Sequence, residues 1–264
     1  MKQINTLLRF FNTAYANKVR RVCEPLDQTF GIDAFWYCHI SSSGAFNHMS
    51  NTPAGTTHYF ENKSYLDNPF LRHPSNYREG FYLLSETLKG KALKLQEDHN
   101  QRFGLDNVLL LCKPEKDACQ VFGFASSNKN LPILNTYFNN LPLLSRFADY
   151  FLQECSSFSL EPFQVDLTML VGNSFNLRFP LQPTVDTDRR EQFLKAMGLT
   201  GLSALTMREK DCLKHYLKGY TAQQTADLLH LSRRTVETHF ENIKNKLGCF
   251  SKAEILQNLR NYYG

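Results

Sequence analysis

The feature that most restricts the fold is a pair of helix starts near the C-terminus, separated by a very short link. Thr221-Ala-Gln-Gln224 has the pattern of a capping box, in which the first and fourth residues satisfy each other's backbone amides. Ser232 provides the N-cap of the next helix, and only His230 and Leu231 stand between the two helices. So short a link forces a sharp crossing, and the small Ala226 allows close approach. The sequence therefore predicts a helix-turn-helix motif at residues 221–240.

The second helix of this pair has two different faces. Its apolar residues recur at steps of four, three and four, which predicts one buried stripe: Val236, Phe240, Ile243 and Leu247. The opposite face is polar and carries Arg233, Arg234, Glu237, Thr238, Glu241 and Lys244. A helix of this kind fits the major groove of DNA. The alternative is that these charges only solvate a small helical bundle.

Two more helix starts complete a C-terminal module. Thr206-Met-Arg-Glu209 opens a helix that ends near Gly219, and Ser251-Lys-Ala-Glu254 opens a last one. Residues 201–264 hold ten Lys or Arg against six Asp or Glu, which gives +4 of the chain's net +5, whereas 19 of the 21 Phe precede residue 201. We expect a small basic four-helix domain at 201–264, joined to a larger aromatic-cored domain.

The first 160 residues have the pattern of an α+β domain. Apolar spacing of three and four predicts helices at residues 4–22 and 131–151, and residues 53–65 are also expected to be helical. Pro142 is expected to kink the last of these helices. Short apolar runs predict two β-hairpins, formed by residues 35–40 with 45–49 and by residues 105–112 with 120–126. We expect an α/β/α sensor domain with an antiparallel sheet at 1–160.

Residues 161–200 are expected to be the interdomain connection. Pro162, Pro180 and Pro183 interrupt this segment, and residues 186–197 fit one helix. No stretch of the chain has the length and hydropathy of a transmembrane helix, and the N-terminus fits an amphipathic helix better than a signal peptide. We therefore expect a cytoplasmic protein whose seven cysteines are reduced and mostly buried, with a redox-sensing pair as the alternative.

The C-terminal module resembles the LuxR-type helix-turn-helix family across all four helices. The matching residues are Leu205-Thr206, Arg208-Glu209, Gly219-Tyr220-Thr221, Ala226, Leu229, Leu231-Ser232, Thr235-Val236, His239, Asn242-Ile243 and Lys246-Leu247-Gly248. One departure is Thr225, where the family usually has a β-branched aliphatic residue. The resemblance implies a sequence-specific transcription regulator that binds double-stranded DNA.

The resemblance also implies roles for single positions. The residues expected to contact phosphates, and so to fix the register on DNA, are Thr221, Ser232, Arg233, Thr235 and Lys246. Glu237, Thr238 and Glu241 would face the base edges, where Glu accepts from cytosine and Thr contacts a base or a thymine methyl. Mere exposure to solvent is the alternative for each of these three.

We expect a homodimer on DNA, because one recognition helix reads too few base pairs. The resemblance suggests that the last helix supplies part of the dimer contact through Ile255, Leu256 and Leu259. The alternative is that this apolar stripe only closes the bundle.

The N-terminal domain more weakly resembles the autoinducer-binding domain of quorum-sensing LuxR regulators. The resemblance lies in the order of elements and in patches at residues 30–35, 59–69 and 103–105. In that family a Trp, a Tyr and an Asp that precedes a Pro line the acyl-homoserine-lactone pocket. Alignment on Pro69 puts Tyr59 at the Tyr position, Asn68 at the Asp position and Gly55 at the Trp position.

The candidate pocket residues are therefore Trp36, Tyr59, Asp67 and Asn68. Asp67 lies one place before the expected carboxylate, and Trp36, the one Trp of the chain, lies on an early strand. Because two recognition groups are displaced or lost, we expect a hydrophobic small molecule or a partner rather than a typical acyl-homoserine lactone. For Trp36, Tyr59 and the many Phe, an ordinary core is favoured over a ligand pocket.

These features favour a one-component regulator over the alternatives. A phosphorylation-controlled receiver would begin with a strand and alternate parallel strands with helices, unlike this chain. An enzyme with a DNA-binding tail would need a catalytic motif, and we find no Gly-rich phosphate loop, nucleophile elbow or paired metal-binding His motif. His58-x-x-Glu61 fits a solvated helix face. We expect no enzymatic activity, cofactor, metal site or membrane contact, and keep the acyl-homoserine-lactone receptor as the alternative.

Overall fold

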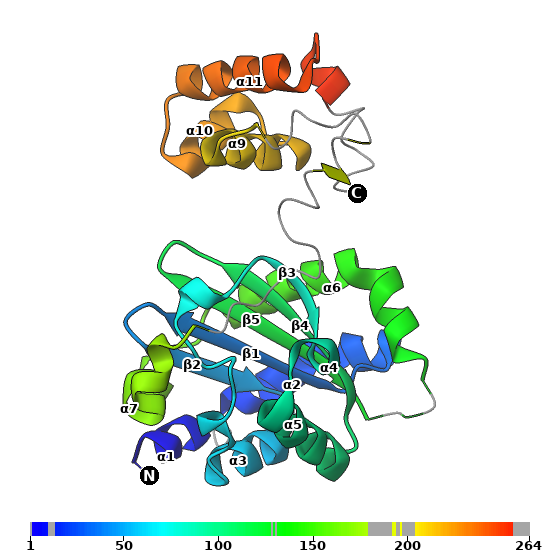
Figure 1. Cartoon of the computed structure of the whole chain (residues 1–264), viewed down its shortest axis with the longest axis vertical. Coiled ribbons are helices and arrows are strands. Elements are labelled where there is room, and N and C mark those ends of the chain that lie inside the picture. The colour runs from blue at the N-terminus through cyan, green and yellow to red at the C-terminus, as the bar shows by residue number, and fades with distance from the viewer. Residues whose placement is uncertain are drawn as a thin grey trace. The chain divides into compact units, whose positions relative to one another are not determined.

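The computed structural model describes residues 2–9, 14–127, 129, 131–178, 192, 193, 196 and 204–255. The chain divides into two compact units, Met1–Gln182 and Pro183–Gly264 (Figure 1).

The first unit is built on a six-stranded antiparallel sheet with the strand order β3-β4-β5-β1-β2-β6. The strands are β1 (Ala34–Ser41), β2 (Ala45–Ser50), β3 (Gly80–Leu83), β4 (Asp106–Pro114), β5 (Ala118–Ser126) and β6 (Val165–Asp166). Both predicted hairpins are confirmed, as β1–β2 and β4–β5. The two hairpins join through β1 and β5, where Trp36 lies opposite Gly123. That long-range pairing was not predicted.

Helices cover both faces of this sheet, which confirms the α+β class with an α/β/α arrangement. The helices of the first unit are α1 (Lys2–Arg9), α2 (Ala14–Phe30), α3 (Pro53–Glu61), α4 (Leu84–Thr87), α5 (Gly90–Phe103), α6 (Ile133–Cys155) and α7 (Leu167–Val171). Helices α2 and α6 cover one face, and Figure 1 shows α3 and α5 together on the opposite side. Side chains alternate along β1, so Phe35 packs toward α2 and α6 while Cys38 packs toward the other layer.

Helix α6 contains the predicted interruption. The backbone of Asn140 is non-helical, with φ of −129°, two residues before Pro142. Proline cannot donate the helical hydrogen bond and crowds the preceding turn, so the helix bends there. Helix α5 was not predicted, and no side chain of it is fully buried in the core. Its less exposed face turns out to line a cavity.

Residues at the start of the expected connection form part of the first unit. Short 3₁₀ helices at Glu161–Phe163 and Gly172–Asn176 flank β6 and α7, and Val165 pairs with Phe46 of β2. Leu167, Val171 and Phe175 are buried in the core beneath the sheet. This segment therefore packs against the sheet up to about residue 177, while most of the helix expected at 186–197 lies outside the described residues.

The second unit contains three described helices, α9 (Met207–Leu217), α10 (Ala222–Leu229) and α11 (Arg233–Leu247). Two of the three predicted capping boxes form completely, at Thr206 with Glu209 and at Thr221 with Gln224. The third, at Ser251, forms only in part, because the Glu254 carboxylate accepts from the Phe250 amide instead of the Ser251 amide. Ser232 caps α11, because its hydroxyl oxygen accepts from the backbone amide of Thr235. A local sequence pattern was therefore enough to place each of these helix starts.

The predicted stripe of α11 forms the core of this unit. Val236, Phe240 and Ile243 are buried and pack against Ala226 of α10, whereas Leu247 is partly buried. His230 occupies the left-handed region with φ of +54°, which allows the chain to reverse within the short link. The start of the last predicted helix is also present, since the Ser251 hydroxyl accepts from the Glu254 amide. Residues 256–264 lie outside the described part of the chain.

Candidate DNA-binding face and ligand cavity

The outward face of α11 carries the residues predicted to meet DNA. Seven of the ten candidates are exposed: Thr221, Ser232, Arg233, Arg234, Thr235, Thr238 and Glu241. The other three, Glu237, Lys244 and Lys246, are partly buried. The structure thus brings the predicted base-facing residues together on one surface of one helix, next to the two N-caps.

Two ion pairs run along this face. Arg233 Nε lies 2.8 Å from Glu237 Oε1, and Lys244 Nζ lies 2.8 Å from Glu241 Oε2. In each pair at least one partner is well exposed, and pairs of this spacing on a helix surface contribute only about 0.3–0.5 kcal/mol. They can therefore open at little cost, which would leave the Glu oxygens free to accept from base edges and the cations free for phosphates.

Lys246 has a different environment from the other candidates. Its Nζ lies 2.7 Å from Oε2 of Glu209, a side chain that is only 3% exposed. The same oxygen of Glu209 accepts from the Thr206 amide, so one carboxylate joins the start of α9 to the end of α11. Burial by itself would raise the pKa of Glu209, but the hydrogen bonds from Lys246 and Thr206 outweigh it and the pKa is lowered. Lys246 therefore stabilises the domain, whatever it does on DNA.

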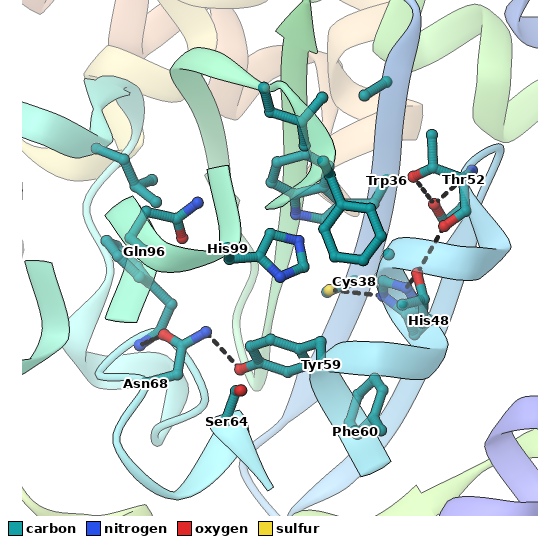
Figure 2. A pocket seen from close by; sticks show the side chains of 18 of the residues that line it. Trp36, Cys38, His48, Thr52, Tyr59, Phe60, Ser64, Asn68, Gln96 and His99 are labelled. Atoms are coloured by element: carbon teal, nitrogen blue, oxygen red, sulfur yellow. Dashed lines mark hydrogen bonds between the residues drawn. The ribbon is translucent and has the colours of Figure 1, made fainter. Parts of the chain in front are cut away.

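The first unit contains a cavity of about 460 Å³ between the sheet and helices α3 and α5 (Figure 2). Its size falls in the range of small-molecule sites. Its apolar walls include Trp36, Phe46, Phe60, Phe70, Leu84, Leu88, Leu95, Phe103, Leu105 and Leu110. Trp36 and Tyr59 line this cavity and also pack against the core beside it, so their role in a ligand pocket stays a prediction. The expectation of ordinary core is confirmed for Phe35, Phe122 and Phe151, which pack against one another on the other face of the sheet.

Tyr59 and Asn68 form a hydrogen-bonded pair at the cavity wall. The Asn68 amide nitrogen donates to the Tyr59 hydroxyl oxygen over 2.5 Å, and the Asn68 Oδ1 accepts from the Phe70 backbone amide over 2.8 Å (Figure 2). Burial raises the pKa of Tyr59 well above its usual value, so its hydroxyl stays protonated. Both residues were predicted as pocket residues, and both line the cavity.

Asp67, the remaining acidic candidate, does not line the cavity. Its carboxylate lies 2.8 Å from Lys91 Nζ, and its side chain is 40% exposed. The left-handed backbone of Lys63 starts the short turn at Ser64–Leu66 that precedes it. Because its carboxylate pairs with Lys91 and Asp67 is not among the residues that line the cavity, Asp67 does not replace the carboxylate that Asn68 lacks.

Trp36 reaches the cavity because Gly123 has no side chain. A Cβ atom at Gly123 would lie 2.0 Å from Cε2 of the Trp36 ring on the neighbouring strand. At Gly55, the position where the resemblance places a Trp, the nearest side chain is His99 of α5, 3.7 Å from an added Cβ. No tryptophan therefore lies at position 55, where the resemblance places one. The side chain nearest to that position is His99.

The sequence did not single out a second polar wall of the cavity. Cys38 Sγ lies 3.3 Å from His48 Nδ1, and His48 Nε2 lies 3.2 Å from Thr56 Oγ1. The Thr56 hydroxyl donates to the Thr52 carbonyl, so the chain runs from the thiol through the Nε2–H imidazole to the backbone. Burial lowers the pKa of His48 to about 3 and raises that of the Cys38 thiol. Both side chains are neutral near pH 7.

Helix α5 supplies two further polar residues, Gln96 and His99. Burial lowers the pKa of His99 to about 4, with a smaller contribution from the nearby His58, so this imidazole is also neutral. A helical spacing was available as a signal, since Ala92, Leu95, His99 and Phe103 recur at steps of three and four. The charged residues between these positions made the helical pattern difficult to recognise in the sequence.

The described residues show few features of metal binding or of membrane insertion. The described residues include no group of three or more His, Cys, Asp or Glu that could hold a metal ion. Within the same residues, no helix is both long and apolar enough to cross a membrane. All seven cysteines are buried free thiols.

The C-terminal unit is a helix-turn-helix domain with a polar recognition face. Residues 203–258 match the family described as "Bacterial regulatory proteins, luxR family", so this unit is a DNA-binding domain of that family. The confirmed resemblance covers this part of the chain.

Curated relatives match this chain over a stretch of about the same length. Similar proteins include the transcriptional regulatory protein ComA of Bacillus subtilis, 46% identical over 50 residues, which are 19% of this chain and 23% of ComA. The quorum sensing-dependent regulator VjbR of Brucella ovis is 41% identical over 51 residues, 19% of this chain and 20% of VjbR. The match with these two relatives spans about a quarter of their length or less.

Among solved structures, Escherichia coli SdiA aligns with 98% of this chain and 95% of its own, at 18% identity and a TM-score of 0.39. That score is too low to support an inference about the site. The cavity must therefore be interpreted from its own geometry.

Proposed function

We propose that this chain is a one-component transcription regulator of the LuxR type. The C-terminal unit binds duplex DNA, and an uncharged small molecule in the cavity of the N-terminal unit controls that binding. The observation that carries the proposal is the α10–α11 pair, whose caps, core stripe and outward polar face match the family along residues 203–258. The cavity supports the second part of the proposal, that a small molecule controls DNA binding.

DNA affinity is expected to depend on the cations of α11. Arg234 is the clearest test, because it is exposed and has no carboxylate partner among the described residues. Arg234→Ala in the full chain should weaken binding to all DNA sequences alike. The logarithm of the affinity should also fall less steeply with the logarithm of the salt concentration, by about 0.9 for each phosphate that is no longer neutralised. Lys116→Ala, which removes the same charge from the exposed β4–β5 turn, is the matched control. Equal affinity of Arg234→Ala and wild type would contradict this assignment.

Sequence preference is expected to depend on Glu237, Thr238 and Glu241. Each good contact to a base edge contributes about 1–3 kcal/mol of discrimination. Selection from random DNA with wild type, Glu237→Ala and Thr238→Ala should therefore recover different preferred sites. Identical sites would mean that these side chains only face solvent.

The protein is expected to bind as a homodimer to two half-sites about one helical turn apart. Ile255 is fully buried in the core of its own unit, which favours its role in closing the bundle. Leu256 and Leu259 lie outside the described residues. Footprinting that showed a single unpaired half-site would contradict dimeric binding.

The cavity is expected to bind an apolar, uncharged molecule, and the chain is expected to have no enzymatic activity. Mass spectrometry of the native protein purified from its host would identify a ligand that stays bound, and the DNA affinity of the ligand-free and ligand-loaded protein would then be compared. A ligand that occupies the cavity without changing DNA affinity would remove the regulatory half of the proposal and leave DNA binding intact.

A further inference from the structure

The Tyr59–Asn68 end of the cavity is richer in hydrogen-bond donors than in acceptors. Two donors of this pair have no acceptor among the described residues: the second amide hydrogen of Asn68 and the hydroxyl hydrogen of Tyr59. The orientation of Asn68 is fixed, because its Oδ1 must meet the Phe70 amide. Its nitrogen therefore points toward Tyr59, whose oxygen already accepts from it (Figure 2).

The acceptors of the cavity are mostly used inside the protein. On one wall, the hydrogen bonds run from Cys38 through His48 to Thr56 and end on a backbone carbonyl. Asp33 is the one acidic residue of the lining, and its two oxygens accept from the Ser127 amide and hydroxyl. Gln96 and His99 keep acceptor capacity, but both belong to α5 rather than to the Tyr59–Asn68 pair. The Ser64 hydroxyl, which can donate or accept, lies near Tyr59 (Figure 2).

Charge is nearly absent from the inner surface. The lining contains no Lys, Arg or Glu, and its one carboxylate, on Asp33, is held by hydrogen bonds from Ser127. His48 and His99 are uncharged near neutral pH. A buried ion without a partner is costly, so a carboxylate or an ammonium group on the ligand would be disfavoured.

We propose that the ligand is an uncharged apolar molecule that presents a carbonyl, ester or ether oxygen, and no N–H group, to Tyr59 and Asn68. This inference rests on the proposed function, because it specifies the chemistry of the same regulatory cavity. An oxygen acceptor would pair with the hydroxyl of Tyr59 and the free hydrogen of Asn68. An amide N–H placed between these two hydrogens would meet donors instead of acceptors, which is expensive in a buried site.

A matched pair of probes tests whether the cavity prefers an oxygen acceptor to an N–H group at this position. N-octanoyl-homoserine lactone and α-octanoyloxy-γ-butyrolactone differ only in the replacement of the amide N–H by an ester oxygen. Titration calorimetry with the full chain should show that wild type binds the ester about tenfold more tightly or better. Asn68→Asp should reverse the order, because a carboxylate in this place accepts from the amide N–H. Asn139→Asp, the same change at an exposed position of α6, is the control and should keep the wild-type order.

The outcomes separate the inference from the function on which it rests. Equal affinities, or tighter binding of the amide by wild type, would overturn the acceptor-only ligand while leaving a ligand-controlled regulator in place. Binding of neither probe, by a protein whose DNA affinity responds to the ligand found by mass spectrometry, would overturn the inference and leave ligand control in place. If Asn68→Asp does not fold, Tyr59→Phe serves instead: it removes the hydroxyl donor and should weaken ester binding about tenfold while affecting the amide less.

Discussion

The two units of this chain keep their polar side chains in different places. The N-terminal unit turns Asn68, Tyr59 and His99 inward around a cavity, whereas the C-terminal unit turns Arg234, Glu241 and their neighbours outward from a closed core. An inward site depends on empty space that several elements must leave between them. An outward site needs only a well-formed helix. The first should therefore be sensitive to added volume, and the second to the loss of single polar partners.

The largest effect is expected from adding one methyl group beneath the cavity. Gly123→Ala places a Cβ atom about where the Trp36 ring lies, at 2.0 Å in the unrelaxed structure. Overpacking of this kind costs about 1–3 kcal/mol, and so close an approach favours the upper end. Chemical denaturation followed by the fluorescence of Trp36, the one Trp of the chain, would measure the loss in the N-terminal unit.

Gly55→Ala is the matched control, because the same change there meets nothing closer than His99 at 3.7 Å. Gly55 lies inside α3, so alanine should keep or raise stability by up to about 1 kcal/mol. If both variants behaved alike, the Trp36 ring would not occupy the space above Gly123 and would not form the inner wall of the cavity.

The second effect should appear in the C-terminal unit. Lys246→Met leaves the buried carboxylate of Glu209 without its cation. Removing one partner of a fully buried pair costs about 3–5 kcal/mol, and since Lys246 is 33% exposed we expect about 2 kcal/mol. Loss of helical circular dichroism, with Trp36 fluorescence unchanged, would assign the effect to this unit. Lys244→Met, which removes a surface pair with Glu241, should cost only a few tenths of a kcal/mol.

The same contrast explains what the sequence could predict. In the C-terminal unit, the caps at Thr206, Thr221 and Ser232 and the stripe of α11 depend on neighbours three or four residues away, so they were visible in the sequence. The link between Glu209 and Lys246 spans 37 residues and was not. The capping role predicted for Glu209 is correct but incomplete.

In the N-terminal unit, the hairpins were predicted because they are local, but their joining through β1 and β5 was not. The cavity depends on that joining, since Gly123 makes room for Trp36 only once the two strands are neighbours. Aromatic composition could not separate a packed core from a lined hollow. Phe35 and Trp36 are adjacent in sequence, yet the first is core and the second lines the cavity.

A smaller effect is expected when acid removes the charge of Glu209 rather than its partner. Because the folded-state pKa is lowered from the ordinary 4.5, the pair contributes its full stability above that value and loses it as the pH falls through the lowered pKa. The protonated side chain still fills its place, so the loss should be smaller than in Lys246→Met. Unfolding of the C-terminal unit measured between pH 6 and pH 3 should therefore be steeper with pH in wild type than in Glu209→Gln. Parallel curves would mean that protonation of Glu209 does not change the stability of the C-terminal unit.

The smallest effect should be a gain in stability, at Thr225. This side chain is fully buried in the C-terminal core, and its hydroxyl oxygen has no hydrogen-bond partner among the described residues. A buried polar group without a partner costs about 1–3 kcal/mol, and valine keeps the branched shape without the hydroxyl. Thr225→Val should therefore stabilise this unit by about 1 kcal/mol, measured by denaturation followed by circular dichroism. Thr221→Val is the matched control: its hydroxyl caps α10 by accepting from the Gln224 amide, so the same substitution should cost about 1 kcal/mol. Opposite signs at two threonines four residues apart would show that this unit tolerates polar groups on its surface and penalises them inside, whereas a loss of stability at both would mean that Thr225 has a partner in the folded protein.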